Sequence, residues 1–127
     1  MQTAAEFFNL YNHGFLRAAV GIPEVRVAEP TFNAARTVEL MEQAGREQAG
    51  LILFPELGLS AYTCDDLFHQ QALLEGAIAA LRTVQQASVA LSLVTVVGLP
   101  LQVAHLLFNC AVVLYRGRIL GVVPKTF

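Results

Sequence analysis

The sequence predicts an α/β protein in which helices pack on a mixed sheet. Two helical patterns alternate with short apolar runs, and a two-strand hairpin pattern follows them near the end of the chain. Hydrophobic residues make up 55% of the chain and charged residues only 14%, whereas globular proteins average about 45–50% and about 25%. This excess predicts strands buried on both faces, or a segment of a larger core.

The first part of the chain predicts a strand followed by a helix. Residues 15–20 (FLRAAV) predict a short strand. Thr31 or Asn33 can cap a helix that runs to about Gln48. Apolar residues at helical spacing predict one buried face, formed by Ala34, Val38 and Met41.

A second strand and a second helix come next. The apolar run 51–54 (LILF) predicts a strand, which Pro55 ends because proline has no amide hydrogen for the ladder. Asp65 or Asp66 is predicted to cap a helix that ends near Ala87. The predicted buried side of this helix consists of Leu67, Leu74, Ile78 and Leu81.

The last part of the chain predicts three strands. Residues 93–97 predict a buried strand closed by the glycine and proline of 98–100 (GLP). Residues 109–115 and 118–123 flank 116–117 (RG), which is a two-residue hairpin signal. No linker, internal repeat or low-complexity segment divides the chain.

Charge and hydropathy exclude several classes of partner. The net charge is −2 and the eight Lys and Arg residues are scattered, which predicts no nucleic-acid partner. The longest apolar stretch, 87–101, is shorter than the roughly 20 residues of a membrane helix, and we expect no secretory leader. We therefore expect a cytoplasmic protein with no membrane partner.

The cysteines and histidines give no metal or disulfide pattern. Cys64 and Cys110 lack such spacing, which fits a reducing compartment. Cys64 precedes a predicted helix, where the helix dipole favours a thiolate, but Asp65 and Asp66 oppose its ionisation, so we interpret it as structural. Cys110 lies within a predicted strand and is interpreted as core. The three histidines share no ligand spacing, so no metal site is expected.

Glu56 is the first candidate for catalysis because it directly follows an apolar strand and Pro55. Polar groups at strand ends line the usual ligand crevice of α/β sheets. Apolar neighbours would raise the pKa of this carboxylate, which suits a general base. A surface glutamate in a loop fits the same position, and position alone favours that alternative.

Lys125 is the second candidate and the only lysine of the chain. It also follows a strand and a proline, in 122–124 (VVP), so we predict that Glu56 and Lys125 project from one end of the same sheet. Its ammonium could stabilise a tetrahedral oxyanion, and the two residues beside a nucleophile would suit acyl transfer through a thioester. By position alone, a solvated surface lysine is the favoured alternative.

Two stretches resemble a known family. Residues 53–62 (LFPELGLSAY) resemble the catalytic-glutamate segment of the nitrilase (carbon–nitrogen hydrolase) superfamily, and 122–127 (VVPKTF) resemble its lysine segment. Further stretches resemble the amidase domain of glutamine-dependent NAD+ synthetases, namely 11–19 (YNHGFLRAA), 62–70 (YTCDDLFHQ), 97–100 (VGLP), 108–113 (FNCAVV) and 116–121 (RGRILG). Ala61 stands where many relatives carry glycine.

The resemblance implies a nitrilase-type α-β-β-α sandwich with a Glu–Lys–Cys triad. Glu56 would be the general base and Lys125 the oxyanion stabiliser. Tyr62 would line the glutamine pocket, although packing at the sheet edge would also explain this tyrosine. Residues 1–127 would be the first part of the glutaminase domain, with the nucleophilic cysteine and the synthetase domain following them.

The same resemblance implies how the whole enzyme works. Glutamine would supply ammonia, which passes internally to the synthetase domain for amidation of adenylated nicotinic acid adenine dinucleotide to NAD+. ATP and Mg2+ would bind that second domain, and the present stretch would need no cofactor. The enzyme would be a homo-oligomer. The alternatives are a stand-alone amidase that acts on another small amide and a catalytically inactive fragment or interaction module.

Overall fold

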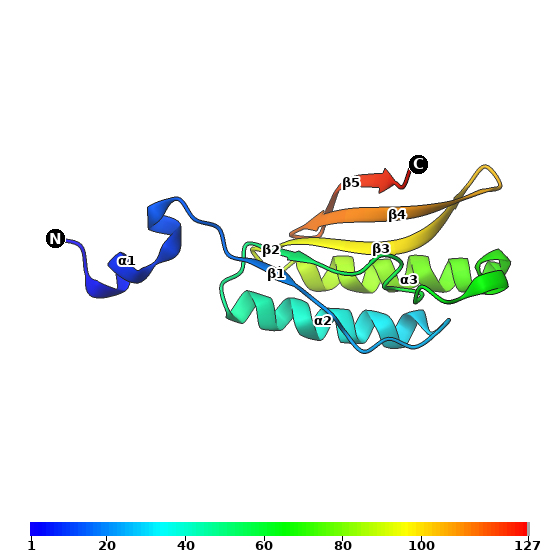
Figure 1. The fold of residues 1–127 in the computed structure, drawn as a ribbon, viewed down its shortest axis with the longest axis horizontal. Coiled ribbons are helices and arrows are strands. Elements are labelled where there is room, and N and C mark those ends of the chain that lie inside the picture. Colours follow the sequence, from blue (N-terminus) through cyan, green and yellow to red (C-terminus); the bar gives the residue numbers. More distant parts are fainter. Residues whose placement is uncertain (127) are drawn as a thin grey trace.

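The computed structural model describes residues 1–126 and contains one five-stranded sheet with two long helices against it (Figure 1). The strands are β1 (Ala18–Val20), β2 (Leu51–Leu53), β3 (Val94–Val103), β4 (Leu106–Tyr115) and β5 (Arg118–Pro124). The helices are α1 (Ala4–Phe8), α2 (Pro30–Arg46) and α3 (Gln71–Ser88), with short 3-10 helices η1 (Leu10–His13) and η2 (Asp65–His69). Phe127, the last residue of the stretch that resembles the lysine segment, lies outside the described residues.

The sheet is mixed, as the sequence predicts. Its spatial order follows the chain, from β1 to β5. Strands β1, β2 and β3 pair in parallel, whereas β3, β4 and β5 pair antiparallel. Helices α2 and α3 form the two crossovers between the parallel strands, and both lie on the same side of the sheet (Figure 1). The predicted α/β class with helices packed on a mixed sheet is confirmed.

The first strand is shorter than predicted. The sequence pattern starts it at Phe15, but β1 begins at Ala18, and Phe15 and Leu16 are exposed. Its partner β2 has only three residues, so the ladder between them can pair only three. The residues before β1, including α1 and η1, extend away from the sheet and the long helices (Figure 1).

Helix α2 starts without the predicted side-chain cap. Glu29 is the N-cap and makes no capping hydrogen bond, while Pro30 occupies the first turn. Proline suits this position because its ring presets the helical φ and its missing amide hydrogen is not needed there. Asn33 instead lies inside the helix, fully buried, and bonds to the main chain of Arg26 and Leu59. Thr31 also lies inside the helix.

Helix α3 starts six residues after the predicted cap at Asp65. Asp65 and Asp66 form the first turn of η2, and α3 itself begins at Gln71 without a side-chain cap. The helix ends at Ser88, close to the predicted end. The prediction that Ile78 is buried is wrong, since this side chain is 39% exposed. The buried stripe runs instead through Leu73, Leu74, Ala77, Ala80, Leu81 and Val84.

Strand β3 continues past the glycine and proline that were predicted to end it. Gly98 lies within the strand, paired with Ala111. A Cβ at Gly98 would come within 2.5 Å of the amide nitrogen of Leu57 and 2.9 Å of the carbonyl oxygen of Pro55. The glycine is therefore needed for close approach of the loop after β2, and not for a turn.

Of the two hairpin turns, one is predicted from the sequence and the other is not. Arg116 and Gly117 have φ values of 47° and 80°, as a two-residue turn with two left-handed residues requires, so this hairpin is confirmed. Ala104 and His105 make the β3–β4 turn with φ values of 48° and 68°. Alanine is not a typical residue for left-handed backbone, although histidine is enriched there, so the pair gives no strong turn signal in the sequence.

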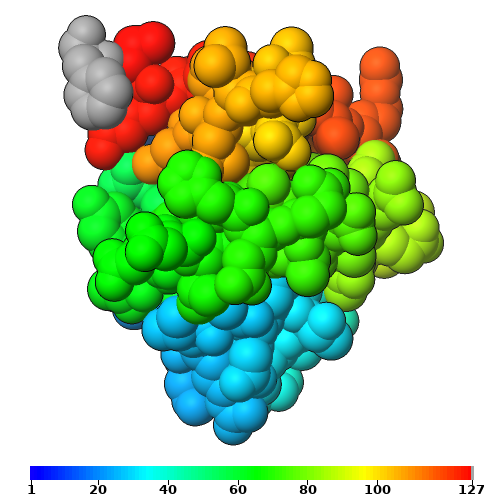
Figure 2. Space-filling model, turned by 90° about the vertical axis from the view of Figure 1, so that its right-hand side faces the viewer, coloured from blue at the N-terminus to red at the C-terminus, as the bar shows by residue number. Residues whose placement is uncertain are grey.

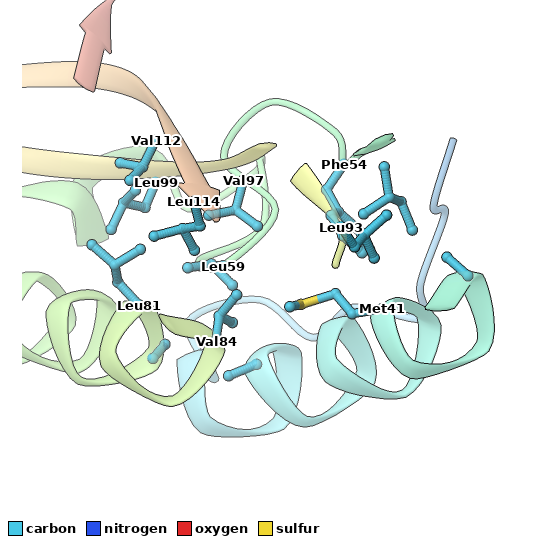
Figure 3. Close-up of a cluster of buried hydrophobic side chains, with 14 of the residues drawn as sticks. Met41, Phe54, Leu59, Leu81, Val84, Leu93, Val97, Leu99, Val112 and Leu114 are labelled. Carbon is cyan, nitrogen blue, oxygen red and sulfur yellow. The ribbon is translucent and has the colours of Figure 1, made fainter. Parts of the chain in front are cut away.

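The core lies between the sheet and the two long helices (Figure 3). Met41 from α2 and Val84 from α3 belong to the same buried cluster as Val97 and Val112 from the sheet, and all four are essentially inaccessible to solvent. Alternation along the strands turns the remaining side chains to the other face of the sheet. No described element covers that face, which the register makes a continuous apolar surface containing Val20, Leu53, Val96, Ala111 and Val123.

Candidate active site

Glu56 lies in a loop that begins where β2 ends. The ladder continues for one residue, with the Phe54 amide donating to the carbonyl of Val96 at 3.0 Å, and Pro55 ends it. The loop then folds back across β3, since the Leu59 amide donates to the Gly98 carbonyl at 3.1 Å. These contacts fix the loop at the carboxyl end of β2, where it presents a side chain that is 40% exposed.

Lys125 lies at the corresponding end of β5. Since β4 is antiparallel to both β3 and β5, strand β5 runs in the same direction as β2 and β3. The carboxyl ends of these strands therefore share one edge of the sheet. The amide of Lys125 extends the ladder by donating to the carbonyl oxygen of Asn109 at 2.8 Å.

Glu56 and Lys125 meet at this edge, although they are 69 residues apart in the chain. The Nζ atom of Lys125 donates a hydrogen bond to Oε1 of Glu56 at 2.8 Å. The prediction that both residues project from one end of the same sheet is confirmed. Their catalytic roles stay predictions.

A third polar residue, Asn109, completes the cluster. Its side-chain amide donates to the same Oε1 atom of Glu56. We did not single out this residue from the sequence. The available signal is one amide side chain in the otherwise apolar strand 106–115 (LLFNCAVVLY), but only the structure shows that it faces Glu56.

The three residues set the charge state of the site. The hydrogen bond from Lys125, followed by that from Asn109, lowers the pKa of Glu56 below its ordinary value. The bond to Glu56 in turn raises the pKa of Lys125. The expectation that apolar neighbours raise the pKa of Glu56 is wrong for this chain, because the carboxylate is partly exposed and paired. At neutral pH the site therefore holds a carboxylate beside an ammonium.

Two hollows meet at the cluster, and Glu56, Asn109 and Lys125 line both. The first, of about 610 Å³, lies over the uncovered apolar face of the sheet. The second, of about 680 Å³, also contains Tyr62 and Asp65. Tyr62 is 64% exposed and lines the hollow beside Lys125, whereas its role in binding stays a prediction.

The segment that carries Tyr62 covers one end of the molecule. In Figure 2 it is part of the green region, which lies between α2 (blue) and the β3–β4 hairpin (yellow to orange). Cys64 anchors this segment: its thiol is buried and donates to the carbonyl oxygen of Ser60 at 3.0 Å. The thiol thus links the loop at the second hollow to Ser60, a fully buried residue four positions earlier.

Neither cysteine of the described chain is suited to act as a nucleophile. Cys64 is 2% exposed, and its thiol proton is used in the bond to Ser60. Burial raises the pKa of the Cys110 thiol, which disfavours the reactive thiolate. These observations agree with the interpretation of both residues as structural.

Within residues 1–126, no group of three or more His, Cys, Asp or Glu side chains is arranged to hold a metal ion. Over the same range, no helix has the length and apolar character needed to cross a bilayer.

The fold and the Glu56–Lys125 pair define a class: an α/β domain of the nitrilase type, with a carboxylate and an ammonium paired at one sheet edge. The carbon–nitrogen hydrolase family model matches residues 17–126, and the chain belongs to this family.

Similar sequences point to one group within the family. The glutamine-dependent NAD(+) synthetase of Mycobacterium tuberculosis is 39% identical over 121 residues, and that of Mycobacterium leprae is 37% identical over 122 residues. These matches cover 95% and 96% of this chain. The chain spans only 18% of the length of each relative.

Solved structures confirm the nitrilase-type fold. A glutamine-dependent NAD(+) synthetase from Cytophaga hutchinsonii matches with a TM-score of 0.82 and 22% identity, over 88% of this chain and 19% of that one. The synthetase from Acinetobacter baumannii gives 0.75 and 26%, over 85% and 20%. A nitrilase-superfamily amidase from Nesterenkonia gives 0.77 and 21%, over 87% and 42%.

Proposed function

We propose that this chain supplies the glutamate and lysine of a glutaminase site, and that the complete protein uses ammonia from glutamine to form NAD+. The contact of 2.8 Å between Lys125 and Glu56 is the observation that carries the proposal. The choice of glutamine and NAD+ rests on the similarity to glutamine-dependent NAD(+) synthetases over nearly the whole chain. The amidase likeness is below 25% identity and supports the fold alone.

The proposed reaction begins with a cysteine from the chain that follows residue 127. Glu56 accepts the thiol proton, and the thiolate attacks the side-chain amide carbon of glutamine. Lys125 stabilises the oxyanion of the tetrahedral intermediate, and Glu56 returns its proton to the departing nitrogen, so that the intermediate collapses to a thioester and ammonia leaves. Glu56 then takes a proton from water, the hydroxide attacks the thioester, and glutamate and the free thiol are released.

The charge states of the pair are those that the first step needs. A proton acceptor must be ionised before it acts, and Glu56 is ionised at neutral pH, although its lowered pKa makes it a weaker base than an unpaired carboxylate. Lys125 remains protonated at the same pH because its pKa is raised. In this proposal Tyr62 lines the part of the second hollow where glutamine binds.

The remaining steps belong to the rest of the complete protein. The proposal assigns ATP and Mg2+ to a synthetase domain, which receives the ammonia and amidates adenylated nicotinic acid adenine dinucleotide. It places the protein in the cytoplasm as a homo-oligomer. No step in the described chain needs a metal.

The complete gene product tests the proposal directly. Glutamine hydrolysis would be measured as glutamate release, and NAD+ formation would be measured with glutamine and separately with ammonium as the nitrogen source. We expect both nitrogen sources to support NAD+ formation. Hydrolysis of other small amides with no use of glutamine would contradict the proposal and identify a stand-alone amidase.

A further inference from the structure

Asn109 connects the two proposed catalytic residues through different parts of its own structure. Its side-chain amide donates to Oε1 of Glu56, and its carbonyl oxygen accepts the backbone amide of Lys125 at 2.8 Å. It therefore contacts the loop after β2 and the residue after β5 at the same time. No other described residue bonds to both Glu56 and Lys125.

The side chain of Asn109 is held more rigidly than that of Lys125. Asn109 lies within β4, opposite Pro100 of β3, and its side chain has only two rotatable bonds. Lys125 reaches Glu56 with a flexible four-carbon chain that is 51% exposed. A carboxylate held only by such a lysine can turn about its own side-chain bonds, whereas a second donor from a fixed strand limits that rotation.

Both donors converge on one oxygen of the carboxylate. Lys125 and Asn109 each bond to Oε1, and within residues 1–126 no donor is bonded to Oε2. The two oxygens of Glu56 are therefore not equivalent. Oε1 is occupied by two hydrogen bonds, while Oε2 keeps its lone pairs free to accept a proton.

From this geometry we propose that Asn109 is a positioning residue, which holds Oε1 of Glu56 and leaves Oε2 as the oxygen that takes the thiol proton. The inference rests on the function proposed above. The proton moves from the sulfur atom to Oε2, and the electron pair of the S–H bond stays on sulfur as the thiolate. Asn109 acts through Glu56 and takes no part in bond making.

Two variants of similar shape separate positioning from simple packing. Asn109→Leu keeps the volume and removes the amide donor, whereas Asn109→Asp keeps the shape and puts a second carboxylate beside Glu56. Asn12→Leu is the matched control, because its exposed amide bonds to the Glu6 carbonyl in the segment before β1. Circular dichroism checks that each variant is folded. If Asn109→Leu does not fold, Asn109→Asp alone distinguishes positioning from packing.

The first readout is independent of catalysis. Carbon-13 NMR of this chain, labelled at the glutamate side-chain carboxyl carbon, follows the titration of Glu56, and Glu56→Gln assigns the signal. We expect the pKa of Glu56 to rise in Asn109→Leu and to rise further in Asn109→Asp, because a like charge disfavours ionisation. An unchanged midpoint in both variants would overturn the proposal.

The second readout is the pH profile of glutamine hydrolysis by the complete protein. We expect kcat to fall by up to about 100-fold in Asn109→Leu, with KM little changed and the acid limb moved to higher pH. Equal losses in both variants without movement of the acid limb would indicate a merely structural residue. If the unaltered protein hydrolyses no glutamine, the proposed function fails, and the NMR titration still shows whether Asn109 holds Glu56.

Discussion

At the scale of single residues, the sequence predicts where Glu56 and Lys125 lie but not the direction of the pKa shift of Glu56. Glu56 and Lys125 each follow an apolar strand and a proline, and this local pattern was sufficient to predict that they project from one end of the same sheet. The pKa of Glu56 was predicted in the wrong direction because it depends on contacts with Asn109 and Lys125, which are distant in the chain. Sequence patterns place residues at strand ends, but they do not show which partner faces which.

The first prediction at this scale concerns the proposed base. In the complete protein, Glu56→Gln keeps the side-chain shape and removes the proton acceptor. We expect glutamine-dependent NAD+ formation to fall by at least about 100-fold, the lower end of the contribution from general acid–base catalysis. NAD+ formation from added ammonium should be unchanged. Loss of both activities would show that Glu56 is structural.

The second prediction concerns the pH dependence of the pair. Lys125 is the largest cause of the lowered pKa of Glu56, so Lys125→Met should raise this pKa. Carbon-13 NMR titration of the chain measures it, with Arg82→Met, which removes a cation from α3, as the control. An unchanged Glu56 midpoint would show that the ion pair does not form in solution.

The pair also gives stability a defined, although small, pH dependence. Because the pKa of Glu56 is lowered, its contribution is present above the ordinary value of 4.5 and is lost as pH falls through the lowered pKa. The raised pKa of Lys125 gives a contribution that is fully present below 10.5 and is lost as pH rises through the raised pKa. Both groups are exposed, so solvent screens the effect.

At the scale of elements, regular strands and helices were easier to predict than their ends. The alternation of strands and helices and the Arg116–Gly117 turn were recognised from periodicity and turn chemistry. The Ala104–His105 turn and the full length of β3 were not, because long antiparallel pairing with β4 overrides weak local preferences. Gly98 was interpreted as a strand end, although its role depends on its contact with the loop at residues 55–57.

Gly98 gives a prediction at this scale. In Gly98→Ala the new methyl group would meet the main chain of Leu57 and Pro55 at 2.5 and 2.9 Å, so the loop that carries Glu56 must move. We expect the free energy of unfolding to fall by about 1–3 kcal/mol, as is typical of overpacking. Chemical denaturation measures this change.

Gly121→Ala in β5 is the matched control for this variant. A Cβ at Gly121 would have no neighbour within 4 Å, and this glycine has no left-handed backbone. It should therefore leave the unfolding free energy nearly unchanged. Equal destabilisation by both variants would show that loss of glycine in a strand, and not contact with the Glu56 loop, is the cause.

At the scale of the whole molecule, the two faces of the sheet differ sharply. One face is covered by α2 and α3, whereas the other exposes apolar side chains such as Val20, Leu53 and Val123. The excess of apolar over charged residues in the sequence already indicated strands that need cover on both sides. The composition did not show which face lacks cover, since that depends on the register of five strands.

The last prediction is that this chain alone hydrolyses no glutamine and associates with itself. Both cysteines of the described chain are buried, so no nucleophile stands beside Glu56. The uncovered face drives association: burying about 500 Å² of apolar surface would contribute roughly 12 kcal/mol, at about 25 cal/mol per Å², before the entropic cost of association.

Sedimentation velocity should show dimers or larger species, and a glutaminase assay should show no turnover. Val123→Lys on this face should shift the chain toward monomer, whereas Ile78→Lys on the exposed side of α3 should not. A monomeric unaltered chain, or turnover that Cys64→Ala removes, would contradict the argument.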